Sequence, residues 1–324
     1  MSIHAQIQTT NVFKLFQLIF LTLIIGLFFN STNLYVKATT WEESPKKNVA
    51  VSVLKPLSLA SRAFGINSIR ENARQLIGLE RDDKIDDFEF KTKDKTITKP
   101  KPSGEIRVKQ RLSPENKLTS WIIGDSLATI PGESLLSQLP IASFDVYGLD
   151  SRVSTGFSRP DVFNWSSNIY DFVTNRKPES VVISIGANDD QPIYIDGTSI
   201  GPFGSENWKN KYYERVNATL DFLAQNNVFV LWVEIPPVRD PVRNARYDII
   251  NQITSKAISE HKANSVLVET RTAFTDTNGI YNDSLPVDGS ETLLRTADGI
   301  HFTRAGGNLI ARLVIEKLRV FYDF

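Results

Sequence analysis

The chain has 324 residues, of which 41% are hydrophobic, and its 37 basic and 37 acidic residues leave a formal net charge of zero. This length accommodates one domain of ordinary size, roughly 100–200 residues, together with an appendage. The neutral charge gives no reason to expect nucleic acid as a partner, and the absence of cysteine excludes disulfides, thiolate catalysis and cysteine-ligated zinc.

The first predicted element is a nearly continuous apolar run, Phe13–Phe29. As a helix it would span roughly 25 Å, compared with ~30 Å for the hydrocarbon core of a bilayer. Lys14 could reach the interface and lengthen the span, whereas "VKA" at Val36–Ala38 has small or branched residues that would suit a signal peptidase. We therefore expect residues 1–38 to be a signal peptide or an uncleaved anchor in the inner membrane. Either alternative places the rest of the chain in the periplasm or otherwise outside the cytoplasm.

Two segments are expected between this run and the main domain. Residues 39–90 have apolar side chains at helical spacing, including Leu59, Phe64, Ile69 and Leu76, which predicts a membrane-proximal helical segment. Residues 91–117 contain nine Lys or Arg, three acids and three prolines, a composition typical of a flexible basic linker. The alternative for this linker is contact with an anionic envelope polymer or lipid headgroups.

From Leu118 to Phe324, short apolar runs alternate with helical patterns. The expected strands are rich in β-branched and aromatic residues and lie at 119–124, 143–149, 180–186, 228–235 and 265–270. The expected helices lie at 206–226, 243–262 and 305–322. This alternation predicts an α/β domain with a mainly parallel five-stranded sheet and helices on both faces.

Four polar or glycine-containing motifs follow the predicted strands. They are Gly124–Ser126, Ser151–Asp161, Gly186–Gln191 and, after a polar excursion, Asp298–His301. In parallel sheets, ligands bind beyond the carboxyl ends of the strands. We therefore expect the four motifs to converge on one edge of the sheet.

Together these motifs contain the groups needed for acyl transfer. Ser126 would be the nucleophile and His301, one of three histidines, its base. Asp298, three residues earlier, would contact His301 within a helical turn and fix its tautomer. The N–H groups of Ser126 and Gly156 and the amide of Asn188 would stabilise the oxyanion. Each residue alone is more often a helix cap, a turn residue or a surface group; their joint occurrence points to catalysis.

The sequence resembles the SGNH (GDSL-type) hydrolases through Ser126, Gly156, Asn188, and Asp298 with His301. More narrowly it resembles the exported bacterial branch called DUF459, through "STGFSRPDVFNW", "GANDDQ", "ENWKNKYYERV", "VLWVEIPPVR" and "LLRTADGIHFTRAGG". The resemblance covers about Leu118–Phe324. It implies a three-layer, flavodoxin-like fold and a metal-independent esterase or acyltransferase without a cofactor. The serine block, "GDSLAT", departs from the pattern because no serine- or glycine-rich run follows it.

Several further residues have weaker predicted roles. Asp125 would brace the serine turn or cap a helix, and Asp189 would position the Asn188 loop. The residues that could contact substrate, or equally form surface salt bridges, are Arg159, Gln191, Arg239 and Arg295. Trp165 and Trp208 could offer a face to a sugar, although core packing is the default for tryptophan on a helix.

The favoured function is therefore a serine esterase of the cell envelope acting on an acylated glycan, peptidoglycan or lipid. Its alternatives are an O-acyltransferase using the same site and a non-catalytic envelope-binding module. A metallophosphoesterase is disfavoured because its two-metal site would need several histidines and only His301 is available. The expected partners are the substrate and, if the N-terminal segment is retained, the membrane.

Overall fold

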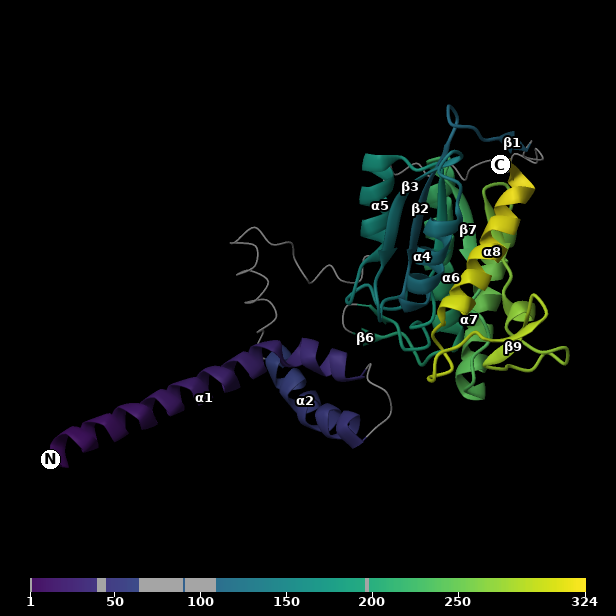
Figure 1. Ribbon diagram of the computed structural model, residues 1–324. Helices are drawn as coiled ribbons and strands as arrows, with labels where there is room; N and C mark the ends of the chain where they lie inside the picture. Colours follow the sequence, from purple (N-terminus) through teal and green to yellow (C-terminus); the bar gives the residue numbers. More distant parts are fainter. Residues whose placement is uncertain (1, 40–44, 64–89, 91–108, 196–197) are drawn as a thin grey trace. The chain divides into compact units, whose positions relative to one another are not determined.

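The computed structural model describes residues 2–39, 45–63, 90, 109–195 and 198–324 (Figure 1). The chain forms two compact units, Met1–Lys84 and Ile85–Phe324. Residues 64–89 of the predicted helical segment and residues 91–108 of the predicted linker lie outside the described residues.

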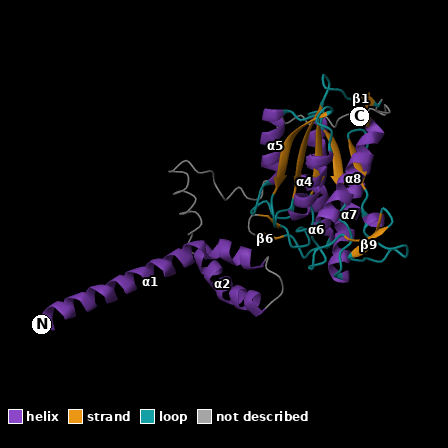
Figure 2. Cartoon of the chain, in the orientation of Figure 1, coloured by secondary structure: helices purple, strands orange, loops and turns teal. Residues whose placement is uncertain are grey.

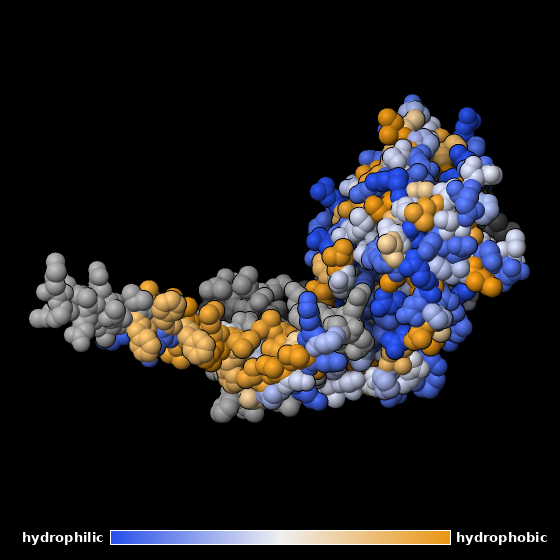
Figure 3. Space-filling model, turned by 60° about the horizontal axis from the view of Figure 1, so that its bottom comes forward, coloured by the Kyte–Doolittle hydropathy of each residue, from blue (hydrophilic) through white to orange (hydrophobic). Residues whose placement is uncertain are grey.

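The first unit contains two helices, α1 (Ser2–Thr39) and α2 (Pro45–Ala63). The Ser31 hydroxyl is buried between them, 2.7 Å from the carbonyl oxygen of Phe28 and 3.2 Å from that of Leu57 on α2. Large apolar side chains of α1 are exposed, for example Phe16, and they form much of the orange surface of this unit in Figure 3. Within the described ranges, no helix combines the length and the apolar character needed to cross a membrane.

The second unit is built on a five-stranded sheet with the order β3-β2-β4-β7-β8. All four pairings in it are parallel. The strands are β2 (Leu118–Gly124), β3 (Phe144–Ser151), β4 (Ser180–Ser184), β7 (Phe229–Val233) and β8 (Ser265–Val268). The five predicted strands are confirmed, and their order is that of a flavodoxin-like fold. The chain changes direction across the sheet between β2 and β4, which is where such folds bind ligands.

Helices cover both faces of this sheet (Figure 2). On one face α4 (Thr129–Gln138) packs against α8 (Arg304–Phe321). On the other face α5 (Trp165–Arg176) and α6 (Glu206–Gln225) meet through Tyr170 and Phe222, and α6 packs on α7 (Pro241–Glu260). Successive residues of β2 contact the two layers, because Trp121 stacks on Phe172 of α5 and Ile122 lies against Gly132 of α4. The predicted three-layer architecture is therefore confirmed.

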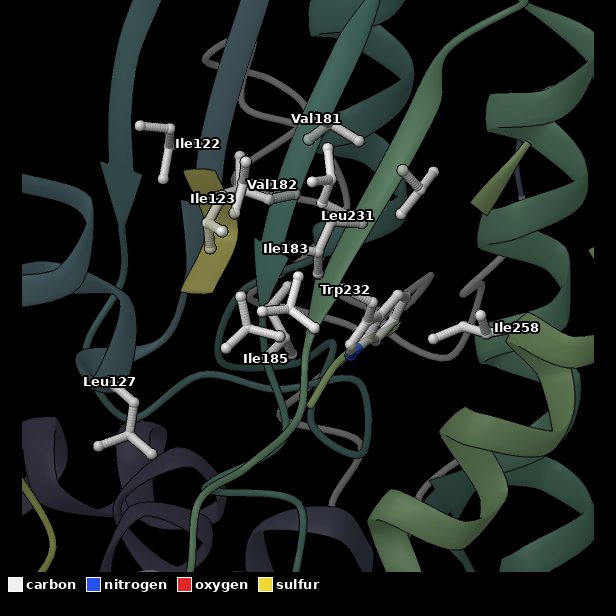
Figure 4. Packing of buried hydrophobic residues seen from close by; sticks show 14 of the residues in the cluster. Ile122, Ile123, Leu127, Val181, Val182, Ile183, Ile185, Leu231, Trp232 and Ile258 are labelled. Atoms are coloured by element: carbon white, nitrogen blue, oxygen red, sulfur yellow. The ribbon is translucent and has the colours of Figure 1, made fainter. Parts of the chain in front are cut away.

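The core lies where the strands meet the helices (Figure 4). Ile123, Val181, Ile183 and Leu231 are completely buried. Burying a side chain of this size stabilises the fold by about 1.5–3 kcal/mol relative to leaving it exposed. A parallel strand covered on both faces is largely apolar, which is why these strands were visible in the sequence.

Short strands complete the domain. β1 (Gln110–Arg111) pairs in parallel with β11 (Tyr322–Asp323), so part of the predicted 91–117 linker joins the domain at its C-terminus. The polar excursion before Asp298 is an antiparallel hairpin of β9 (Ser284–Val287) and β10 (Ser290–Leu293). β5 (Tyr194–Ile195) pairs antiparallel with β6 (Thr198–Ser199), and 3-10 turns form at η2 (Ser126–Ala128) and η3 (Arg271–Ala273).

Candidate active site

The serine motif is held at the carboxyl end of β2 by Asp125. One of its oxygens accepts from the N–H of Leu127 at 2.9 Å and thereby caps η2, which begins at Ser126. The other accepts from the N–H groups of Gly186 and Ala187, at 3.0 and 2.9 Å, in the loop that follows β4. The Asp125 carboxylate is buried, and this burial raises its pKa to about 7 although the three N–H donors lower it. Asp125 therefore both caps the turn and fixes it to the neighbouring loop.

His301 lies between Ser126 and Asp298. Its Nε2 is 2.9 Å from the Ser126 Oγ, and its Nδ1 is 2.6 Å from the Asp298 Oδ2. Both distances are those of hydrogen bonds. With Nδ1 protonated toward the carboxylate, Nε2 is the acceptor for the serine proton. The fold thus brings together the three side chains that the sequence placed in one site.

The Asp298–His301 contact forms in a tight turn before α8 rather than in the helical turn that we expected. The Oδ1 of Asp298 accepts from the N–H groups of Ile300 and His301, at 2.8 and 3.0 Å, and from the hydroxyl of Thr296 at 2.7 Å. Gly299 has a φ of +71°, which favours glycine in this turn. Partial burial would raise the pKa of Asp298, but the hydrogen bond from His301 and those from Ile300 and Thr296 hold it far below its usual range. Asp298 is therefore ionised at neutral pH.

The three predicted oxyanion donors lie on loops that are joined to one another. The side-chain amide of Asn188 donates to the carbonyl oxygen of Thr155 at 3.1 Å, next to Gly156. The backbone N–H groups of Ser126 and Gly156 donate to no acceptor in the described chain. Thr155 was not singled out in the sequence, where a threonine beside a loop glycine gives no signal. The contact orients the Asn188 amide toward the loop that carries Gly156.

Two of the predicted substrate contacts, Arg159 and Gln191, bond to each other and to neighbouring groups of the site loops. Arg159 is buried, makes two hydrogen bonds to Asp161, and donates to the Gln191 side chain at 3.0 Å. The Gln191 amide donates in turn to the backbone carbonyl of Asn188. These side chains therefore support the Asn188 loop.

Arg295, the third predicted contact, is buried in the core with 1% of its surface exposed. Its guanidinium lies between the rings of Phe274 and Phe302, 4.6 and 4.4 Å from their centroids. It donates to the carbonyl oxygen of Pro237 at 2.7 Å and to that of Ile300, next to His301. Burial lowers its pKa to about 10, so it remains charged at neutral pH. Arg295 therefore braces the histidine loop from inside.

Arg239, the last of the residues predicted to contact substrate, lies on the outer side of the turn that carries Asp298 and His301. Arg239 is about half exposed, donates to the carbonyl oxygen of Ala297 at 2.8 Å and forms an ion pair with Asp283. Its backbone N–H also donates to the carbonyl oxygen of Gly299. These contacts place Arg239 beside the turn that carries Asp298 and His301, with part of its side chain open to solvent.

The two tryptophans form the inner support of the site loops. Trp165 and Trp208 are completely buried, so neither offers a face to a sugar. The indole N–H of Trp165 donates to the Thr155 hydroxyl at 3.1 Å, and that of Trp208 donates to the backbone carbonyl of Gln191 at 2.7 Å. The Tyr247 hydroxyl donates to the Ala187 carbonyl at 2.9 Å.

The described part of the chain contains no group of three or more His, Asp or Glu side chains that could hold a metal ion.

A family profile described as "protein of unknown function (DUF459)" matches residues 119–317. The chain belongs to the DUF459 family. This confirms the narrower resemblance inferred from the sequence, and the matched range includes every predicted site residue. No curated protein sequence matches the chain.

Several solved structures are similar to this DUF459 protein. An alpha/beta hydrolase from the metagenome of Lake Arreo, Spain, is 16% identical over 64% of this chain and 97% of its own, with a TM-score of 0.46. The lipase/acylhydrolase from Enterococcus faecalis is 15% identical over 63% and 96% of the two chains, with a TM-score of 0.43. An acetylxylan esterase from Geobacillus stearothermophilus is 16% identical over 66% and 96%, with a TM-score of 0.46.

Proposed function

We propose that this DUF459 protein is a serine esterase whose catalytic triad is Ser126, His301 and Asp298. The observation that carries the proposal is the position of His301, within hydrogen-bond distance of both the Ser126 hydroxyl and the Asp298 carboxylate. A serine hydroxyl becomes a useful nucleophile only when a base takes its proton, and a carboxylate on the far ring nitrogen fixes the tautomer that can do so.

Acylation begins when the Ser126 Oγ attacks the carbonyl carbon of the ester. The serine proton passes to Nε2 of His301, and the ionised Asp298 stabilises the resulting imidazolium. The negative charge on the former carbonyl oxygen is stabilised by the N–H groups of Ser126 and Gly156 and the amide of Asn188. The intermediate then collapses, the alkoxide leaves with the proton from His301, and the acyl group remains on Ser126.

Hydrolysis of the acyl-enzyme requires water at His301. The side chains of His301 and Asp298 are each 45% exposed, so water reaches the imidazole directly. The imidazole takes a proton from this water while the hydroxide attacks the acyl carbon. The carboxylic acid then leaves, and the proton returns to Ser126. This exposure favours hydrolysis over transfer to a second alcohol, because a transferase must keep water away from its acyl-enzyme.

For the substrate we propose an acylated glycan or lipid of the cell envelope, and for the location the extracytoplasmic side of the membrane. The apolar run Phe13–Phe29 at the N-terminus supports export. The exposed catalytic side chains support a substrate too large to be enclosed, such as a polymer that carries small acyl groups.

The esterase proposal is tested with the full-length protein and p-nitrophenyl acetate. We expect release of p-nitrophenolate that survives EDTA, and a fluorophosphonate adduct that peptide mass spectrometry places on Ser126. A wild-type rate no higher than that of Ser126→Ala, together with an unlabelled Ser126, would contradict the proposal.

The substrate class is tested in the source organism. Cells lacking the gene are complemented with the wild-type chain or with Ser126→Ala, and ester-linked acetate in the purified envelope glycan and lipid fractions is measured. We expect more acetate in one fraction of the Ser126→Ala cells than in cells with the wild-type chain. Equal acetate in every fraction would contradict an acetylated envelope substrate.

A further inference from the structure

A second buried carboxylate, Asp189, joins the loops after β3 and β4. One of its oxygens accepts from the N–H of Ser158 at 2.6 Å, and the other accepts from the N–H of Phe157 at 3.0 Å and from the Tyr212 hydroxyl at 2.9 Å. Asp189 follows Asn188 directly and is completely buried. Asp189, the neighbour of the predicted oxyanion donor Asn188, therefore holds the loop that carries a second predicted donor, Gly156.

The same carboxylate explains why residue 156 is a glycine. A Cβ atom at this position would lie 2.6 Å from the Cγ of Asp189 and closer still to its Oδ1, and the three nearest atoms all belong to Asp189. The φ angle of Gly156 is not in the left-handed region, so the backbone conformation does not by itself require glycine. The space normally taken by a side chain is occupied by the carboxylate that accepts from the next two N–H groups.

Asp125 and Asp189 together connect the three loops that carry the oxyanion donors. Asp125 joins the loops after β2 and β4, and Asp189 joins those after β4 and β3. Every hydrogen bond described for their oxygens is accepted from a backbone N–H or, for Asp189, also from the Tyr212 hydroxyl. Neither has a salt-bridge partner among the described residues, and burial raises the pKa of both against the effect of these donors. Buried carboxyl oxygens that are satisfied only by backbone N–H groups and one hydroxyl fix the positions of those groups, because losing any of these hydrogen bonds is costly.

We propose that Asp189 and Asp125 are positioning residues that set the spacing of the oxyanion donors on Ser126, Gly156 and Asn188. The inference rests on the proposed esterase function. It goes beyond that function because neither carboxylate contacts the reacting atoms. Donors stabilise an oxyanion only if they are already in place when the charge develops, and a misplacement of about 1 Å can cost ~10²-fold in rate. The effect belongs to kcat, since the ester in its ground state does not need these donors.

The first test replaces Asp189 with asparagine, which keeps the size but turns an NH2 group toward backbone N–H donors. We expect kcat for p-nitrophenyl acetate to fall by about 10²-fold while KM changes by less than about threefold. The control is Ser120→Ala, which removes a buried hydrogen bond of 2.6 Å to Ser180 near the amino end of β2. We expect this variant to lose thermal stability and to keep its kcat.

The second test is a double-mutant cycle between residues 156 and 189. We expect Gly156→Ala to lower kcat about 10²-fold in the wild-type background but less than about threefold in an Asp189→Ala background, where the clash is gone. If Asp189→Ala does not fold, Asp189→Ser takes its place in the cycle.

The outcomes separate this inference from the esterase proposal. If the wild type is active and Asp189→Asn has an unchanged kcat, the positioning role is overturned and the esterase function stands. The same holds if the effects of Gly156→Ala and Asp189→Ala on kcat simply multiply in the double variant. A wild type without serine-dependent activity overturns both.

Discussion

Replacing either Ser126 or His301 with alanine is expected to lower kcat for p-nitrophenyl acetate by roughly 10⁴- to 10⁶-fold. In the proposed mechanism, Ser126→Ala removes the atom that is acylated, and His301→Ala removes the base, whose Nε2 lies 2.9 Å from that atom. Because the two side chains act in one step, the double variant should be about as slow as either single variant. Stopped-flow or steady-state release of p-nitrophenolate measures all three rates.

A matched control for this prediction is His261, the other histidine in the α/β domain. Its ring is also held by a carboxylate, with Nε2 2.9 Å from Asp221, but it caps the far end of α7 and contacts neither Ser126 nor Asp298. His261→Gln should keep the wild-type kcat. If the fold-decreases in kcat of the two single variants multiplied in the Ser126→Ala/His301→Ala double variant, the two residues would act in separate steps. That result would contradict the proposed triad.

The regular elements that the sequence predicted share one physical property, which is a periodic apolar pattern. Buried parallel strands must be apolar on both faces, and α6 buries one apolar stripe, so both are visible without tertiary information. The sequence indicated a helical stretch after Ser126 but not the bounds of α4, because Pro131 and Gly132 lie in its first turn, where a proline is tolerated but the sequence resembles a loop. The strand β1 has only two residues and forms because β11 is there to pair with it.

The polar residues of the site divide in a similar way. Ser126, Asp298 and His301 were singled out because acyl transfer by a serine requires these residue types together. The positions of Arg159 and Arg295 were not foreseeable, because an arginine is buried only where backbone carbonyls, carboxylates or aromatic rings surround it. The position of Gln191 was not foreseeable either, because its side chain accepts from Arg159. The same reasoning applies to Asp189, whose predicted role in its own loop gave no indication that it reaches the Gly156 loop.

Asp298→Asn is expected to lower kcat by about 10⁴-fold without removing the turn. The asparagine oxygen can still accept from the N–H groups of Ile300 and His301, which now bond to Oδ1 of Asp298. The asparagine NH2 would face Nδ1 of His301 and donate to it, so the ring proton would move to Nε2. In that tautomer Nε2 cannot accept the proton of Ser126, although the ring occupies the same place.

The matched control is Asp283→Asn, because this carboxylate lies beside the same turn and pairs with Arg239 but does not contact His301. It should keep kcat within about threefold of the wild type, whereas an Asp298→Asn variant that did the same would contradict the orienting role of Asp298.

The stability of the Asp298→Asn variant gives a second readout, since the depressed pKa of Asp298 means that its ionised form is favoured in the folded state. The wild type should be more stable than Asp298→Asn at every pH above the ordinary carboxyl pKa of about 3.9, and this advantage should shrink as the pH falls below that value toward the lower folded-state pKa. Thermal unfolding of the two proteins from neutral pH down to about pH 3 measures the difference, and an advantage that grew on acidification would mean that Asp298 is not held as a carboxylate by His301 and the turn.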